Sequence, residues 1–192
     1  LIESLLDRYG VIAAPLIDKE QVAGGFSGLY PVLKRMEEHG NLVRGMFVKG
    51  FGAAQFAGRD TVDALRDDEA RSQSCVALDV TDPANLTGSA ITWPEQHHMK
   101  PARRAESVIV LDHGMPVLFA VPKSHRIVSF TDDERILQPA CTELAYALQH
   151  QSKGSVSFAE MNGESLKERN EYRRLLHAAG FVDSPQGMKL YG

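Results

Sequence analysis

The order of helical and strand-like patterns over residues 1–57 is the feature that most restricts how this chain folds. Apolar residues recur at helical spacing in residues 1–9 and again in residues 26–39, with a shorter helical segment between them. Residues 42–56 then read as two short strands around glycine-rich bends. Three helices followed by a two-stranded ribbon is the order of a winged helix, so we predict a winged-helix module over residues 1–72.

The third helix and the ribbon of such a module are its candidate contacts with nucleic acid. The polar residues expected on the outer face of that helix and on the ribbon are Ser27, Lys34, Arg35, Arg44 and Lys49. Residues 1–57 nevertheless hold six Lys or Arg and six Asp or Glu, so the module is electrically neutral. Winged helices also serve as protein-docking modules, and both functions stay open at this point.

Charge and cysteine usage exclude several classes of protein. The 192 residues carry a formal net charge of −4, whereas an autonomous basic DNA-binding protein carries a strong positive excess. Any contact with a polyanion must therefore come from a local patch.

Cys75 and Cys141 form no CxxC pair, which favours a reducing, cytoplasmic location. No apolar run approaches the roughly 18 residues of a membrane span, so we expect no membrane partner. The absence of an initial Met suggests a piece of a longer protein.

Residues 73–192 have a different character, with strands first and helices later. A polar stretch at residues 67–74 marks the predicted boundary. The β-rich runs that follow, separated by turn residues, are Ser107–Leu111, Pro116–Val121 and Arg126–Phe130. An apolar stripe over residues 136–148 predicts a long helix in which Cys141 is a core residue. We therefore predict an α+β fold in which residues 73–192 form a β-barrel-like antiparallel sheet module with helices.

The loop at residues 93–104, WPEQHHMKPARR, combines one aromatic ring with histidines and cations. His97 and His98 are adjacent, so their side chains converge poorly on one ion, and we predict no metal site. The candidates for phosphate contact are the cations of this loop, Lys100, Arg103 and Arg104. Trp93 either stacks on a base, as aromatic side chains do in single-strand-binding proteins, or anchors the loop on the sheet.

Five stretches of the chain carry a resemblance to a known family: LLDRYGV, GGFSGLYPVLKRMEEHGNLVRGMFVKGFGAAQFA, TDPANLTGSAITWPE, RRAESVIVLDHG and AGFVDSPQGMKL. In this order they resemble the C-terminal part of the bacterial large helicase-related (Lhr) proteins, a family of ATP-dependent 3′–5′ DNA helicases. The resemblance covers nearly the whole chain. It implies that residues 1–72 are the last of a series of winged helices and that the remainder is a β-barrel-like terminal module.

The resemblance also implies a function. The fragment would be an accessory DNA-binding or assembly region of a helicase acting in DNA repair. The 192 residues contain no GxxxxGK[ST] loop, so the ATPase motor, with its ATP and Mg²⁺, would lie upstream, and we expect no cofactor here. The expected partners are single-stranded or forked DNA, the upstream modules of the same chain and, in a homo-oligomer, further copies of the parent.

Two other hypotheses stay open. The family architecture is similar to that of winged-helix DNA glycosylases, which need a carboxylate or amide to place water and stabilise a cationic sugar. The candidate catalytic residues are Gln55, Asp112 and Asp183. Gln55 equally suits pairing with the ribbon backbone, and both aspartates suit turns. The last hypothesis is a winged-helix transcription regulator with a ligand-binding β domain. Whether the fragment is itself an enzyme is left undecided.

Overall fold

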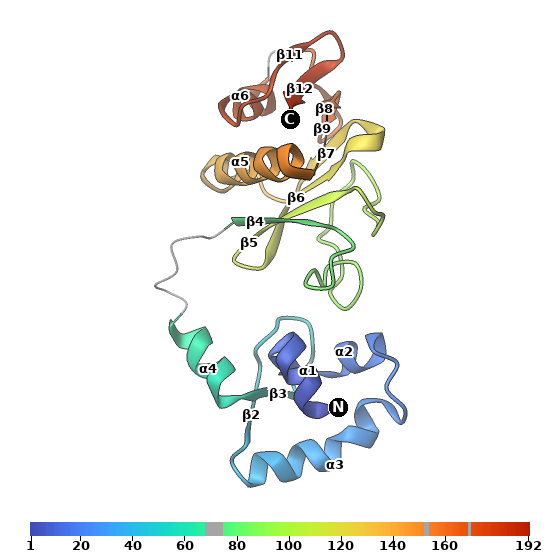
Figure 1. The fold of residues 1–192 in the computed structure, drawn as a ribbon, viewed down its shortest axis with the longest axis vertical. Coiled ribbons are helices and arrows are strands. Elements are labelled where there is room, and N and C mark those ends of the chain that lie inside the picture. Colours follow the sequence, from blue (N-terminus) through green and yellow to red (C-terminus); the bar gives the residue numbers. More distant parts are fainter. Residues whose placement is uncertain (68–74, 152–153, 169) are drawn as a thin grey trace. The chain divides into compact units, whose positions relative to one another are not determined.

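The computed structural model describes residues 1–67, 75–151, 154–168 and 170–192 (Figure 1). Contacts between Cα atoms divide the chain into two compact units, one made of residues 1–72 and 89–92 and the other of residues 73–88 and 93–192. The polar stretch at residues 67–74, where the sequence places a module boundary, lies outside the described residues except for Asp67.

The first unit has the predicted element order of a winged helix. Its elements are α1 (Ile2–Tyr9), β1 (Val11–Ile12), α2 (Ala14–Lys19), α3 (Gly25–Glu38), β2 (Leu42–Gly45), β3 (Gln55–Gly58) and α4 (Arg59–Arg66). The three strands form an antiparallel sheet in the order β1–β3–β2. Strands β2 and β3 are therefore the predicted ribbon, and α3 is the helix that precedes it.

The core of the first unit draws on each of its first three helices. Leu5 of α1, Ile17 of α2 and Leu33 of α3 are buried together with Phe56 of β3. Pro31 lies inside α3, and the helix continues beyond it to Glu38. This packing fixes the orientation of α3, so that the residues opposite Leu33 face solvent.

The second unit contains a six-stranded sheet in the order β10–β9–β7–β6–β5–β4. Its strands are β4 (Cys75–Asp79), β5 (Val108–Asp112), β6 (Met115–Val121), β7 (Arg126–Ser129), β9 (Glu160–Met161) and β10 (Glu164–Ser165). The pairing is antiparallel except between β7 and β9, which run parallel. The three β-rich runs predicted from the sequence correspond to β5, β6 and β7.

Helix α5 (Glu134–Gln151) contacts β4, β5 and β6 on one face of this sheet and packs against α6 (Glu171–Ala178) (Figure 1). A second, three-stranded sheet has the order β11–β12–β8, with β8 (Ser155–Phe158), β11 (Val182–Ser184) and β12 (Gly187–Tyr191). The predicted stripe of α5 is buried, including Leu144 and Cys141. Burial raises the pKa of the Cys141 thiol to about 12, which suits a neutral core residue.

The barrel-like closure expected from the sequence is wrong, although the α+β class is confirmed. Within the described residues, the large sheet is open, with β10 and β4 at its edges, and the small sheet is open as well. The physical reason is the path of the chain. After β7 it leaves the sheet to form α5, which fills the face that a barrel would enclose, and it returns as β8 in another sheet.

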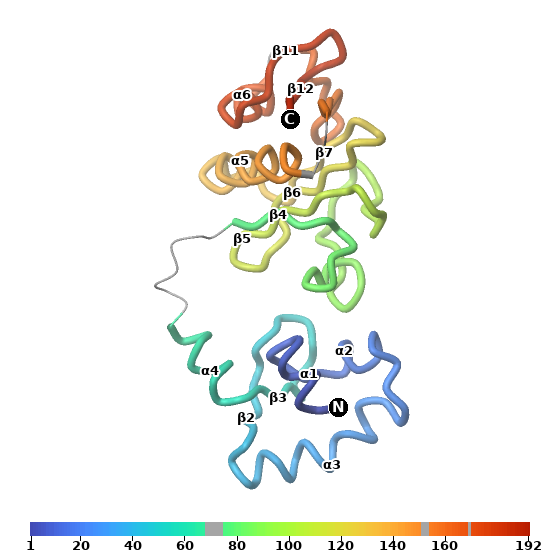
Figure 2. Tube along the Cα trace, viewed as in Figure 1, coloured from blue at the N-terminus to red at the C-terminus, as the bar shows by residue number. Residues whose placement is uncertain are grey.

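The covering loop is defined here as residues 80–88 and 93–107, the parts of the connection between β4 and β5 that belong to the second unit (Figure 2). Ile109, Leu111 and Phe119 point away from α5 and form a separate apolar cluster. Trp93 and Met99 of the covering loop pack against this cluster. The sheet is therefore covered on one face by a helix and on the other by irregular chain.

Candidate nucleic-acid interface

The wing of the first unit consists of β2, β3 and the intervening residues 46–54, and Gln55 organises it. The Gln55 side chain is fully buried. Its oxygen accepts hydrogen bonds from the backbone N–H groups of Phe47 and Val48, at 3.0 and 2.8 Å. Its nitrogen donates to the carbonyl oxygens of Val48 and Gly52, at 2.9 and 2.7 Å. All four hydrogen-bonding positions of the amide are occupied, which favours the structural alternative over catalysis.

The candidate DNA contacts of the first unit all reach solvent. Exposed side chains on α3 and on the wing include each residue singled out from the sequence: Ser27, Lys34, Arg35, Arg44 and Lys49. Lys34 makes a weak ion pair with Glu38 one turn later, at 3.9 Å. Met46, beside these cations on the wing, is 81% exposed. An exposed helix followed by a cationic wing is the surface that a winged helix presents to a duplex or a strand.

Residues 1–57 are neutral as a whole, but their charges are not evenly distributed. Residues 1–24, which contain α1 and α2, hold four acidic and two basic side chains. Residues 25–57, which contain α3 and the wing, hold four basic and two acidic side chains. The two basic side chains of residues 1–24 are engaged in hydrogen bonds: Arg8 donates to Glu20, and Lys19 donates to the hydroxyl of Tyr9, which itself donates to Glu20. The positive end of the unit is therefore α3 and the wing, which suits contact with a polyanion.

Arg103 faces the interior of the covering loop. Its guanidinium donates to the carbonyl oxygens of Asn85 and Thr87 at 2.8 and 3.0 Å, and to that of Asp82 at 3.3 Å. Three backbone acceptors hold the side chain in place. The geometry gives Arg103 a role in folding the loop, in contrast to the phosphate contact expected from its sequence position.

Trp93 is an anchor of the covering loop. Its ring centroid lies 5.0 Å from that of Phe119 and 6.2 Å from that of Phe130. Gly88 lies directly against the indole, because a Cβ at Gly88 would come within 2.5 Å of Nε1. Of the two roles expected for Trp93, the geometry favours anchoring over stacking on a base.

Lys100 and Arg104, by contrast, are exposed and line a groove of about 270 Å³ in the second unit. The covering loop supplies both cations, and β7 supplies a third, Arg126. Apolar side chains lie between them, including Met99 and Val121. The groove brings together two of the three cations predicted for phosphate contact.

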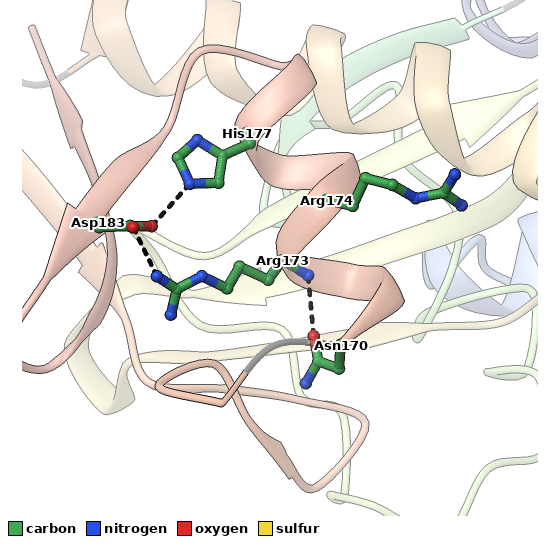
Figure 3. Close-up of a pocket in the computed structure, with 5 residues that line it drawn as sticks. All are labelled: Asn170, Arg173, Arg174, His177 and Asp183. Carbon is green, nitrogen blue, oxygen red and sulfur yellow. Dashed lines mark hydrogen bonds and ion pairs between the residues drawn. The ribbon is translucent and has the colours of Figure 1, made fainter.

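Asp183 lies in a pocket formed by α6 and β11 (Figure 3). One carboxylate oxygen is 2.6 Å from Arg173 and the other is 2.6 Å from Nε2 of His177. Arg173 and His177 are four residues apart, so they project from the same face of α6. Asn170 caps the helix by accepting a hydrogen bond from the Arg173 backbone N–H. The turn signal that follows Asp183 corresponds to a turn at residues 185–186, and Asp183 itself lies in the strand before that turn.

The charge state of Asp183 follows from these neighbours. Partial desolvation raises the pKa of its carboxyl, whereas hydrogen bonds from Arg173 and His177 lower it. The net pKa lies below the ordinary value for aspartate, so the group is ionised at neutral pH. A fixed carboxylate of this kind can stabilise a nearby positive charge, but it is a weak base.

Asp112 occupies the end of β5, beside a two-residue turn. His113 and Gly114 have φ of 47° and 78°, as in the hairpin turns that favour glycine. The Asp112 side chain accepts from the Cys75 thiol at 3.5 Å and lies 3.2 Å from Nδ1 of His113. This placement agrees with the turn role expected for Asp112 and keeps it in a different element from Gln55 and Asp183.

Sequence reasoning missed several residues that line the pocket of Asp183: Asn170, Arg173, Arg174 and His177. A signal was present for Arg173 and His177, because their spacing places both on one helical face. Arg126 belongs to the basic segment 94–130 that the sequence indicates, but its place in the groove depends on strand pairing. Across the part of the chain that the structure describes, no three His, Cys, Asp or Glu residues are grouped so that they could hold a metal ion. Among the described helices, none is both long and apolar enough to span a bilayer.

Comparison with known proteins identifies relatives for the whole chain. Residues 1–76 match the family model for the winged-helix domain of the large helicase-related protein. The chain is 34% identical over 195 residues to the Lhr helicase/uracil glycosylase of Escherichia coli. It is 33% identical over 201 residues to the Lhr helicase/probable uracil glycosylase of Mycolicibacterium smegmatis. Each alignment covers 98% of this chain but only 13% of the relative's length.

Proposed function

Because this chain belongs to the large helicase-related (Lhr) family, we propose that it is the C-terminal, DNA-binding accessory region of an ATP-dependent helicase that acts in DNA repair. The observation that carries this proposal is the cationic surface of α3 and the wing in the first unit. Winged helices insert or lay this helix against nucleic acid and place the wing on the neighbouring backbone.

The chemistry of this surface suits phosphate contact. Lys34 and Arg35 project from α3, whereas Arg44 and Lys49 project from a wing that Gln55 holds in shape. A fixed wing loses little conformational entropy when it binds, so its cations are pre-organised for contact. All four cations can contact phosphate oxygens, and we propose binding that depends on strand structure and salt more than on sequence.

In this proposal, ATP and Mg²⁺ belong to another part of the parent protein. The 192 residues contain no GxxxxGK[ST] loop, whose backbone and lysine bind nucleotide phosphates in such motors. The region described here would hold or guide DNA while the motor translocates. Its other partners would be the preceding modules of the same chain and, in a homo-oligomer, neighbouring copies.

Fluorescence anisotropy with labelled single-stranded and forked DNA tests the proposal on the 192-residue chain. Replacing Arg35, Arg44 and Lys49 together by alanine removes three exposed cations, each worth about 0.5 kcal/mol, so we expect the dissociation constant to rise about tenfold. Arg66→Ala is the matched control, because Arg66 is an exposed cation of α4 that pairs with Asp63. Equal affinity of the triple variant and the control would contradict the proposal.

A second candidate function is removal of uracil from DNA, because both relatives carry uracil glycosylase in their names. The pocket of Asp183 favours it. Hydrolysis breaks the bond between C1′ of the sugar and N1 of uracil, and the electron pair leaves with the base. Water adds to C1′, and its proton neutralises the departing uracil anion. An ionised carboxylate such as that of Asp183 can stabilise the cationic sugar. Arg174 also lines the pocket, but it is paired with Glu134.

Treatment with alkali cleaves DNA at abasic sites and so reveals this activity. We expect the chain to yield uracil-dependent cleavage of a single-stranded oligonucleotide, and Asp183→Asn to lower the rate at least tenfold without changing affinity for DNA. Gln55→Ala and Asp112→Asn serve as comparisons for the other candidates. Full activity of the Asp183→Asn variant would remove the pocket from the reaction.

A further inference from the structure

The covering loop of the second unit is fixed in shape before any ligand binds. Arg103 ties it internally to three carbonyl oxygens, and Trp93 packs it on Phe119. The side chain of Gln96 accepts from the backbone N–H groups of His98 and Met99 at 2.8 and 3.0 Å. Lys100 and Arg104 therefore lie next to residues that are held by hydrogen bonds within the loop. The backbone positions of the two cations are fixed before a ligand binds.

The groove beneath these cations has an apolar floor. Met99 and Val121 are partly exposed and line it, whereas Phe119 beneath them is nearly fully buried. Its volume of about 270 Å³ is small for a drug-sized ligand. A groove of this size with an apolar floor and a charged rim suits a small flat group linked to an anion.

The charges around the groove leave an excess of two positive groups. Arg126 is paired with Glu160 at 2.5 Å, and Lys123 near the rim is paired with Glu106 at 2.6 Å. Over the described residues, no ion pair involves Lys100 or Arg104. These two cations are therefore available for an external anion, although the chain as a whole has a net charge of −4.

We infer that this groove binds one nucleotide unit of single-stranded DNA, with a phosphate at Lys100 and Arg104 and the sugar or base against Met99 and Val121. The inference rests on the proposed function as a DNA-binding region, but it places a contact in the second unit that is separate from α3 and the wing. Arg103 is left out of this contact, because three of its five N–H donors already bind carbonyl oxygens within the loop.

Binding of a labelled oligothymidylate to the 192-residue chain tests the inference. The variant Lys100→Ala/Arg104→Ala should weaken binding about tenfold and lower the slope of log K against log salt by about 1.4, since each single-strand phosphate contact contributes about 0.7. Lys123→Ala is the matched control, because it removes an exposed cation that is already paired. The emission of Trp93, the single tryptophan, verifies that each variant retains the folded covering loop.

Combining the groove substitutions with Arg35→Ala/Arg44→Ala/Lys49→Ala separates this inference from the proposed function. If the groove binds DNA, its substitutions weaken binding in both backgrounds, whether or not the wing contributes. Photo-crosslinking with bromodeoxyuridine should label peptides containing Met99 or Val121. An unchanged salt slope in the folded groove variant, with crosslinks confined to the first unit, would overturn the inference and point to an acidic protein segment as the occupant.

Discussion

At the scale of single residues, polar and aromatic side chains that suggest function from sequence prove to hold loops in place. Gln55 completes four hydrogen bonds within the wing, Arg103 completes three within the covering loop, and Trp93 anchors that loop. Most of their partners are backbone atoms. Nearly every residue carries the same backbone groups, so the sequence does not reveal which of these groups a side chain will bind. The alternatives of pairing and anchoring could be stated from sequence, but only the fold distinguishes between them.

The substitution Gln55→Ala tests the role of the wing amide. It leaves two backbone N–H groups and two carbonyl oxygens without their partner, so we expect the free energy of unfolding of the first unit to fall by about 2–4 kcal/mol. Hydrogen exchange at the amides of Phe47 and Val48 should accelerate. Asn41→Ala removes an exposed amide from the same unit and serves as control. Unchanged protection at residues 47 and 48 would argue against this role.

Trp93 provides its own test, because it is the single tryptophan of the chain. If the indole anchors the covering loop, saturating single-stranded DNA should leave its emission wavelength nearly unchanged. If the indole stacks on a base, emission should be quenched in proportion to binding. The measurement is a fluorescence titration monitored alongside anisotropy. Replacing Gly88 by alanine should shift the emission to longer wavelength, since the added Cβ would displace the ring.

At the scale of elements, the junction of α6 and β11 shows where local patterns stop being informative. The sequence predicts the helix, its apolar side and the turn after Asp183, but not the strand that contains Asp183. The structure places Asp183 in a three-residue strand paired with β12, opposite Met188. So short a strand carries no alternation that sequence analysis could detect. Its carboxylate meets Arg173 and His177 only because β11 folds back along α6.

The pH dependence of stability follows from the same junction. The folded-state pKa of Asp183 is lowered, so its contribution to stability is present above the unfolded pKa of aspartate and is lost as pH falls through the lower folded value. We expect Asp183→Asn to be less stable than the wild type at neutral pH, and the difference to shrink below about pH 4. Denaturant unfolding at several pH values measures it. A difference that is constant with pH would exclude the ionised pair as its cause.

At the scale of the whole molecule, the order of helices and strands can be predicted from sequence more reliably than the closure of a sheet into a barrel. The winged helix, the three β-rich runs and the long helix α5 follow from local periodicity and turn residues. The predicted barrel fails because closure depends on which strands pair. The parallel pairing of β7 with β9 joins residues separated by α5 and by β8, which no local pattern encodes. For the same reason Arg126 joins Lys100 and Arg104 in a groove unseen from sequence.

The salt dependence of binding to single-stranded DNA tests the central claim most directly, namely that the cations of α3 and the wing contact phosphate. We predict that Arg35→Ala/Arg44→Ala/Lys49→Ala lowers the slope of log K against log salt by about 2, since three contacts are lost at about 0.7 each. The control Arg66→Ala should keep the slope of the wild type. A triple variant that binds with the wild-type slope would contradict the account, because its cations would then release no counterions on binding.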